Sequence, residues 1–195
     1  MCRTATCLSR AFPFLVLAIA LALSTAAIAQ QPADTLKIDY FANAAIGIPF
    51  DATVRITNPG TSGGDLCANI YVFAPDQQLT ECCSCLVTPD GLSTLSVKTD
   101  LTANPLTRVR PTTGVFKIIS SAAGTCNAAS VTPVAGVRAW ATHIQVPRAN
   151  LVSVTETAFS DATLSSEELA TVTSQCAFIQ TVGSGHGICT CGTGG

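Results

Sequence analysis

Three cysteines lie within one short segment, Glu81–Cys85, which reads ECCSC and is soon followed by the turn sequence Thr-Pro-Asp-Gly. Adjacent side chains of a β-strand point to opposite faces, so Cys83 and Cys85 share one face and Cys82 lies on the other. A bridge between the neighbours Cys82 and Cys83 would strain the peptide that joins them. The three thiols could be metal ligands, redox groups or halves of disulfides to other parts of the chain, and each of these uses constrains the fold strongly.

The first 29 residues predict a secretory signal peptide. Arg3 and Arg10 supply the positive start, Ala11–Leu23 is apolar apart from a proline, and Ala27-Ile28-Ala29 is a small-residue cleavage site. An uncleaved membrane anchor is the alternative, because the apolar segment is almost long enough to span a bilayer. We expect cleavage, and hence a secreted protein that is periplasmic or extracellular.

The charge and hydropathy of the remaining chain exclude two kinds of partner. The chain has 10 basic and 12 acidic residues, so losing Arg3 and Arg10 leaves 8 basic residues and a net charge of −4. Binding a phosphate backbone needs clustered Lys and Arg, which the remaining chain lacks. Since it also lacks a second long apolar run, we expect neither nucleic acid nor, after signal cleavage, a membrane as partner.

The cysteine count favours disulfides. Cys2 and Cys7 leave with the signal peptide, and an even number remains in a chain that is expected to reach an oxidising compartment. The remaining cysteines are Cys67, Cys82, Cys83, Cys85, Cys126, Cys176, Cys189 and Cys191. We therefore expect a disulfide framework and no cofactor.

Residues 30–191 predict a single domain, mainly β, with an antiparallel immunoglobulin-like β-sandwich. Short β-branched or alternating runs recur between turn signals such as Thr88–Gly91. The predicted strands are Leu36–Phe41, Ala52–Thr57, Leu66–Phe73, Leu79–Val87, Leu92–Val97, Val115–Ser120, Val137–Gln145 and Leu151–Thr157. The third, fourth and fifth of them are expected to form a meander. Residues 192–195 are predicted to be a disordered tail.

One C-terminal α-helix is predicted near residues 165–181. Ser165 and Glu168 have the spacing of a capping box, and Gly183 is placed to end the helix. Leu169, Val172, Cys176 and Ile179 follow at helical spacing. Because Cys176 falls on this inner stripe, the helix should be crosslinked to the sandwich.

The hairpin register suggests a first bridge. If the turn after Phe73 pairs this residue with Leu79, Cys67 lies opposite Cys85, which predicts a Cys67–Cys85 disulfide. A change of one residue in the turn would remove this pairing. Cys126, in the loop after residues 115–120, is then the natural partner of the helical Cys176. The remaining prediction is that Cys82 and Cys83 pair with Cys189 and Cys191, which makes a disulfide-anchored tail.

A metal site is the alternative use of the same sulfurs. Two C-x-C elements, Cys83 with Cys85 and Cys189 with Cys191, would surround one ion, with His186 as a further ligand. Zinc sites with four thiolates usually use C-x-x-C elements, so C-x-C is a weaker match for zinc, and a soft ion such as copper(I) would suit clustered thiolates. Oxidation competes with metal for every thiol outside the cytoplasm, and this favours the disulfide interpretation.

The sequence assembles no active site. Ser184 and His186 lie in a glycine-rich segment, but Ser184 is not centred in a G-x-S-x-G motif. Glu167 and Glu168 have the place of helix N-terminal charges. His143, on a strand beside Trp140, is the remaining candidate, and a hydrolase with an unrecognised site near it is the weaker alternative.

Several blocks resemble a group of exported, cysteine-rich bacterial hypothetical proteins. The shared blocks are C-A-x-I-Y-V-F, E-C-C-x-C followed by T-P, R-A-W-x-T-H and G-x-C-x-C, and they cover roughly Ala52 to Cys191. The resemblance implies export and a common cystine framework. It transfers no catalytic residue.

These observations predict a disulfide-stabilised β-sandwich that acts as a non-enzymatic binding or surface-interaction module. The expected partner is a protein, a glycan or a surface. The loops Asn58–Gly64 and Asn104–Pro111 are the expected contact edges, because binding residues concentrate on loops over a rigid scaffold. Thiolate metal binding remains the alternative.

Overall fold

The computed structural model describes residues 34–42, 44, 50–148 and 151–192. The predicted signal peptide and residues 193–195 of the predicted tail lie outside this range. Gly192, which was assigned to the same tail, is described. Within the described residues, no helix has both the length and the apolar character to cross a membrane.

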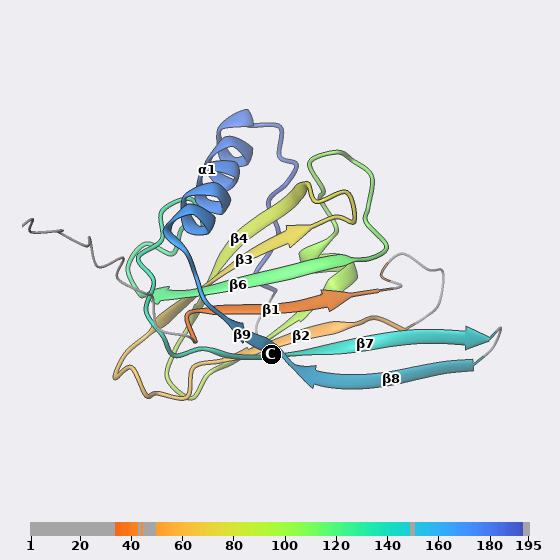
Figure 1. Ribbon diagram of the computed structural model, residues 1–195, viewed down its shortest axis with the longest axis horizontal. Helices are drawn as coiled ribbons and strands as arrows, with labels where there is room; N and C mark the ends of the chain where they lie inside the picture. The colour runs from red at the N-terminus through yellow and green to blue at the C-terminus, as the bar shows by residue number, and fades with distance from the viewer. Residues whose placement is uncertain (1–33, 43, 45–49, 149–150, 193–195) are drawn as a thin grey trace, which may run out of the picture.

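Two antiparallel sheets and one helix form three layers, in which α1 lies over the first sheet and the second sheet lies below it (Figure 1). Sheet A contains β4 (Leu79–Val87), β3 (Leu66–Phe73), β6 (Gly114–Ala122), β1 (Leu36–Phe41) and β9 (Ser160–Ala162), in this spatial order. Sheet B contains β5 (Leu92–Ser96), β2 (Thr53–Thr57), β7 (Arg138–Arg148) and β8 (Leu151–Ala158). The predicted mainly β sandwich with a C-terminal helix is confirmed.

Sheet A is covered on both faces, and its inner strand β3 shows the consequence. Ile70 and Val72 belong to the core between the two sheets, whereas Tyr71 belongs to a second core beneath the helix. The buried Tyr71 hydroxyl donates a hydrogen bond to the Ala128 carbonyl at 2.7 Å. Because both faces need apolar side chains, this strand has an almost continuous apolar sequence where a half-exposed strand would alternate.

The helix α1 (Ser166–Val182) begins and ends where its sequence predicts. The Ser165 side chain accepts a hydrogen bond from the Glu168 backbone N–H at 3.0 Å, and Gly183 closes the helix with φ of 64°. The helix buries Val172, Cys176 and Ile179 against sheet A.

The predicted meander is wrong, because β5 leaves sheet A. It pairs with β2 of sheet B, and the turn before it carries the chain from one sheet to the other. This turn is held by the Asp90 N–H, which donates to the Asn58 carbonyl at 2.8 Å. A loop and the tail instead cover the outer edge of β4. The Leu106 N–H donates to the Thr80 carbonyl, and the Cys82 N–H donates to the Gly187 carbonyl, both at 2.9 Å.

Four disulfides use every cysteine between residues 67 and 191. The first four cysteines bond to the last four in the same order, namely Cys67–Cys126, Cys82–Cys176, Cys83–Cys189 and Cys85–Cys191. The prediction that Cys82 faces away from Cys83 and Cys85 is confirmed, since Cys82 bonds to α1 and the other two bond to the tail.

The predicted Cys67–Cys85 bridge is wrong because β4 contains one extra residue. Phe73 does pair with Leu79, but the next pair is Val72 with Glu81, so Thr80 forms a β-bulge. From there on the register is shifted by one residue, and Cys67 lies opposite Leu86. A shift of one turns a strand residue to the other face, so Cys67 and Cys85 point away from each other.

The predicted Cys126–Cys176 bridge is wrong as well. Cys126 takes Cys67, and Cys176 takes Cys82 on the strand that packs beneath the helix. The expected pairing of Cys82 and Cys83 with the tail is half correct. Cys83 bonds to Cys189, but Cys191 bonds to Cys85, so both tail bridges lie on one face of β4. The disulfide-anchored tail itself is confirmed.

Candidate binding groove

The tail bridges bring four sulfurs together beside β4. The sulfur atoms of Cys83, Cys85 and Cys191 lie within 4.8 Å of one another, and Cys189 is bonded to Cys83. His186, the fifth residue of the predicted metal site, does not belong to this group. Metal ligation requires thiolates, and these sulfurs are bonded in pairs. Thiolate binding of copper or zinc therefore stays a prediction for the reduced chain.

The residues considered for catalysis are buried or form a local turn. His143 is 2% exposed and stacks on Tyr40, with 4.3 Å between the ring centroids. Its Nε2 lies 2.6 Å from the Thr157 hydroxyl and 3.5 Å from an Asp39 carboxylate oxygen. The Ser184 hydroxyl accepts a hydrogen bond from the His186 backbone N–H at 3.2 Å, which is a contact within the loop.

The geometry at His143 does not form a hydrolytic triad. In a triad the imidazole uses one nitrogen for the nucleophile and the other for the orienting carboxylate. Here Thr157 and Asp39 both lie at Nε2, while Nδ1 is buried and has no hydrogen-bond partner among the described residues. Thr157 also donates to Asp39 at 3.3 Å. Through Nε2 the arrangement links β8 and β1 to β7.

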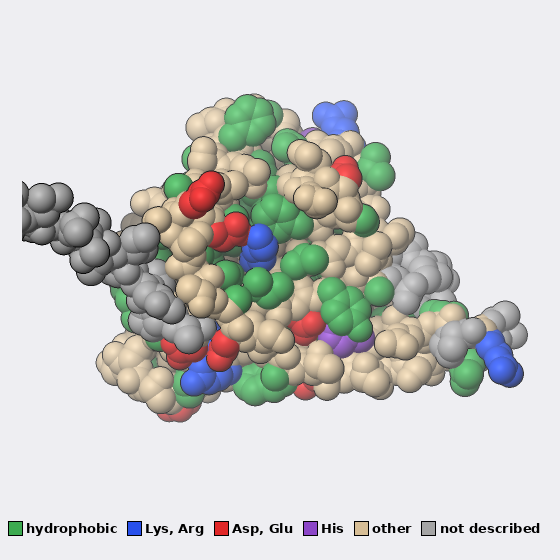
Figure 2. Space-filling view, in the orientation of Figure 1, with side chains coloured by type: hydrophobic (Ala, Val, Ile, Leu, Met, Phe, Trp, Pro, Cys, Tyr) green, Lys and Arg blue, Asp and Glu red, His purple; other side chains and the backbone are tan. Residues whose placement is uncertain are grey.

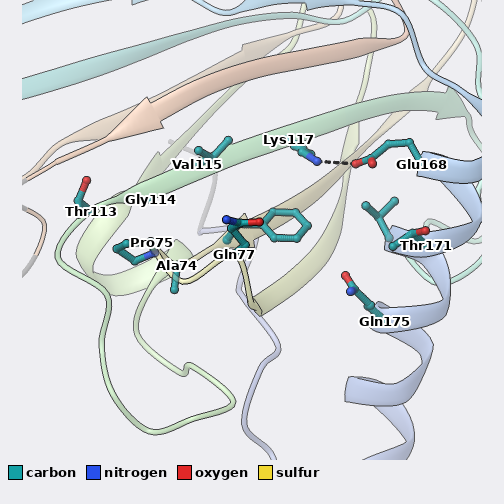
Figure 3. Close-up of a pocket in the computed structure, with 12 residues that line it drawn as sticks. Ala74, Pro75, Gln77, Thr113, Gly114, Val115, Lys117, Glu168, Thr171 and Gln175 are labelled. Atoms are coloured by element: carbon teal, nitrogen blue, oxygen red, sulfur yellow. Dashed lines mark hydrogen bonds and ion pairs between the residues drawn. The ribbon is translucent and has the colours of Figure 1, made fainter.

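A groove of about 540 Å³ lies between α1 and the neighbouring end of sheet A (Figure 3). Three segments that are far apart in the sequence line it. They are the β3–β4 turn (Phe73, Ala74, Pro75 and Gln77), the start of β6 (Thr113, Gly114, Val115 and Lys117) and one face of α1 (Glu168, Thr171, Val172 and Gln175). Its volume falls within the range of about 300–1,000 Å³ that is usual for ligand sites.

The two walls of the groove are joined by a covalent bond and an ion pair. Cys176 of α1 is bonded to Cys82 of β4, which fixes the helix on the sheet. The Lys117 ammonium of β6 forms an ion pair with the Glu168 carboxylate of α1, which joins the sheet wall to the helix wall (Figure 3). Only the serine half of the predicted capping box is formed: the Ser165 hydroxyl accepts from the Glu168 N–H, while the Glu168 carboxylate pairs with Lys117 of β6.

The groove offers polar groups and one aromatic ring, and its charges are balanced. Lys117 and Glu168 are the charged residues of the lining, and they neutralise each other. The Lys117 ammonium also lies 4.8 Å from the centre of the Phe73 ring. In Figure 3, Gln175 points from α1 toward the turn that carries Gln77. Around the groove, charged side chains are sparse on the visible face of the molecule (Figure 2).

The groove was not predicted from the sequence. Its lining comes from three segments that meet only through the fold, and none of them contains a recognisable motif. The expected contact loop Asn104–Pro111 instead borders a neighbouring cavity of about 390 Å³, which also includes Ala74 and Pro75. In the other expected contact loop, Asn58 is buried and donates hydrogen bonds to the Gly64 and Val87 carbonyls, so this residue has a structural role.

Glu81 is a second feature that the sequence did not reveal. Its side chain is fully buried in β4, and one carboxyl oxygen accepts a hydrogen bond from the Asn104 N–H at 3.1 Å. The other oxygen has no hydrogen-bond partner among the described residues. Burial raises the pKa of Glu81 to about 8, although the Asn104 hydrogen bond and the charge of Arg110 oppose this shift. The group is therefore largely protonated at neutral pH.

Comparison with known proteins gives no match. No family model matches the chain, no curated protein matches it, and no solved structure matches its fold. The function must therefore be argued from the groove and its surroundings. The resemblance to the exported bacterial group stays a prediction.

Proposed function

We propose that this chain is a secreted, non-enzymatic binding module whose groove between α1 and sheet A holds a neutral oligosaccharide. The observation that carries the proposal is the lining itself. It combines hydroxyl and amide side chains with one aromatic ring and contains no unbalanced charge. A glycan presents the complementary chemistry, namely many hydroxyl groups and polarised C–H groups.

The polar side chains of the lining suit a ligand that both donates and accepts hydrogen bonds. Gln77 and Gln175 each provide an amide that does both, and Thr113 and Thr171 provide hydroxyls. All four residues are exposed; the Thr113 hydroxyl donates its proton to the Phe41 carbonyl at 2.8 Å and can therefore only accept a hydrogen bond from a ligand. The Phe73 ring adds an apolar surface to the lining, and the Lys117 ammonium lies 4.8 Å from the centre of this ring.

Rigid walls support a binding role. A site that is already formed loses less conformational entropy when the ligand binds than one that must be ordered. Here the Cys82–Cys176 bridge and the Lys117–Glu168 pair hold the helix and the sheet in place before any ligand arrives. Four disulfides are also typical of proteins that work in oxidising compartments, where glycans are abundant.

Filling the groove tests the proposal. Thr171→Trp places an indole in the groove, whereas Thr181→Trp adds the same ring at an exposed position of α1 outside the lining. A panel of neutral oligosaccharides is screened by calorimetric titration or by NMR chemical-shift changes. We expect at least one to bind wild type and Thr181→Trp equally, and to lose about tenfold or more in affinity with Thr171→Trp.

Two results would contradict the proposal. One is a panel in which no neutral saccharide binds the folded wild-type protein. The other is a saccharide whose affinity is the same for both tryptophan variants, because the ligand would then lie elsewhere. Far-ultraviolet circular dichroism of each variant shows whether the sandwich is folded before binding is measured.

A further inference from the structure

The strand β8 is the longest edge strand among the described residues with an edge that no described strand or loop is shown to pair with. Within the described residues, β8 pairs with β7 on one side and has no strand on the other. A strand edge presents backbone N–H and C=O groups that another strand can pair with. We propose that β8 pairs antiparallel with β8 of a second copy of this chain.

The other edges of the sandwich are short or covered. The edge strands β9 and β5 have three and five residues. The edge of β4 is covered by a loop and the tail, through the backbone hydrogen bonds at Thr80 and Cys82. By contrast, β8 has eight residues, of which all but Val152 are exposed. The β7–β8 hairpin also extends beyond the ends of the neighbouring strands, so this end of β8 lies away from the other labelled strands (Figure 1).

The composition of β8 favours pairing. Natural edge strands are usually blocked by lysine, proline or an inward-pointing charge. The β8 sequence LVSVTETA contains neither lysine nor proline and is rich in β-branched residues. Its one charged residue, Glu156, forms an ion pair with Arg55 of β2. Two large apolar side chains are exposed on the strand, with Leu151 at 53% and Val154 at 55%.

Symmetry selects the partner and the register. When a strand pairs antiparallel with its own copy in one sheet, the two-fold axis is perpendicular to the sheet, so facing residues must both be odd or both be even. Pairing centred on Val154 sets this exposed valine against its copy and Glu156 against Val152. A register centred on Glu156 would bring two carboxylates together, which is unfavourable. The Val154 register therefore joins the two copies of sheet B into one continuous sheet.

Charge substitution at the centre of the register tests the proposal on the full chain. Sedimentation velocity is measured from low micromolar to near-millimolar protein, because a small interface gives weak association. We expect wild type to shift from monomer to dimer across this range. Val154→Lys alone and Val154→Glu alone should each remain monomeric, since like charges then face each other. An equimolar mixture of the two should recover the dimer, because the opposite charges are paired.

The matched control is Leu92→Lys, which replaces an apolar residue of similar exposure, 56%, on the opposite edge strand of the same sheet. It should dimerise as wild type does. The proposal is overturned if wild type is monomeric throughout, which would leave the β8 edge to an extended segment of another protein. It is also overturned if Val154→Lys dimerises normally, or if the Lys and Glu variants do not associate when mixed.

Discussion

Glu81 makes the stability of this sandwich depend on pH through one carboxyl group. In the unfolded chain its pKa is expected near the ordinary 4.5, whereas burial raises the folded value to about 8. Well below pH 4.5 the carboxyl group is protonated in both the folded and the unfolded chain, so its burial does not lower the free energy of unfolding. As the pH rises from 4.5 toward 8, the unfolded chain releases the proton and the folded chain retains it. The contribution of Glu81 to the free energy of unfolding therefore falls by about 1.4 kcal/mol for each pH unit in this range.

Glu81→Gln should remove this dependence. Glutamine has nearly the same shape, keeps an oxygen for the Asn104 N–H and carries no charge at any pH. We expect the variant to be more stable than wild type near pH 8 and similar to it below pH 4.5, as measured by urea unfolding at both values. If glutamine lowered the stability equally at the two pH values, Glu81 would not be protonated in the folded protein.

At the scale of single elements, the start of α1 provides the clearest link between sequence and stability. The Ser165 hydroxyl satisfies the Glu168 N–H, one of the backbone donors that the first turn cannot satisfy itself. The same contact orients the residue whose side chain pairs with Lys117.

Ser165→Ala should lower the free energy of unfolding by about 1 kcal/mol, which is typical of a lost N-cap. Ser166→Ala, one residue into the helix and exposed, is the control and should change it little. Chemical denaturation followed by circular dichroism measures both. Equal losses in the two variants would mean that the cap contributes nothing specific.

The strands and the helix could be predicted where residues close together in the sequence determine the secondary structure. Alternating runs and turn sequences predicted eight strands, and a serine, a glutamate and a glycine predicted the helix ends. The strand β9 was missed because its three residues carry no apolar pattern and depend on pairing with β1 and on the Lys37–Asp161 ion pair. The π-helix at Val97–Leu101 was also missed.

Connectivity and the groove could not be predicted, because each depends on contacts between distant segments. The bulge at Thr80 shifts the β3–β4 register by one residue, so Cys67 and Cys85 lie on opposite faces of sheet A and cannot bond to each other. The groove needs α1, the β3–β4 turn and β6 to meet at one place. The sequence of each segment taken alone does not indicate that the three segments lie together.

At the scale of the whole molecule, the tail bridges act as one unit. Cys83–Cys189 and Cys85–Cys191 each close a separation of 106 residues, and they are offset by two residues at both ends. Once either bridge has formed, the other closes only a very small additional loop. Much of the stabilisation by a disulfide comes from restricting the unfolded chain, so the second bridge contributes little of this kind.

Removing these bridges should therefore be strongly non-additive. Replacing Cys85 and Cys191 by alanine should cost much less than the about 2–4 kcal/mol that is typical of one disulfide. Replacing all four tail-bridge cysteines should cost more than the sum of the two separate pairs. The control is the replacement of Cys67 and Cys126, whose bridge shares neither end with the tail bridges. Its loss should lower the free energy of unfolding by the typical amount for one disulfide. Guanidinium unfolding without reductant measures each variant, and additive costs would show that the bridges act separately.

The order of the bridges also governs how the chain must mature. Every bridge joins an early cysteine to a late one, so Cys67, Cys82, Cys83 and Cys85 all emerge before any correct partner is present. An oxidant that acts on the growing chain would join these four to one another first. Reaching the native set then requires those premature links to be broken and exchanged through mixed intermediates. Yield of the native protein should accordingly depend on a disulfide isomerase in the compartment where it is made.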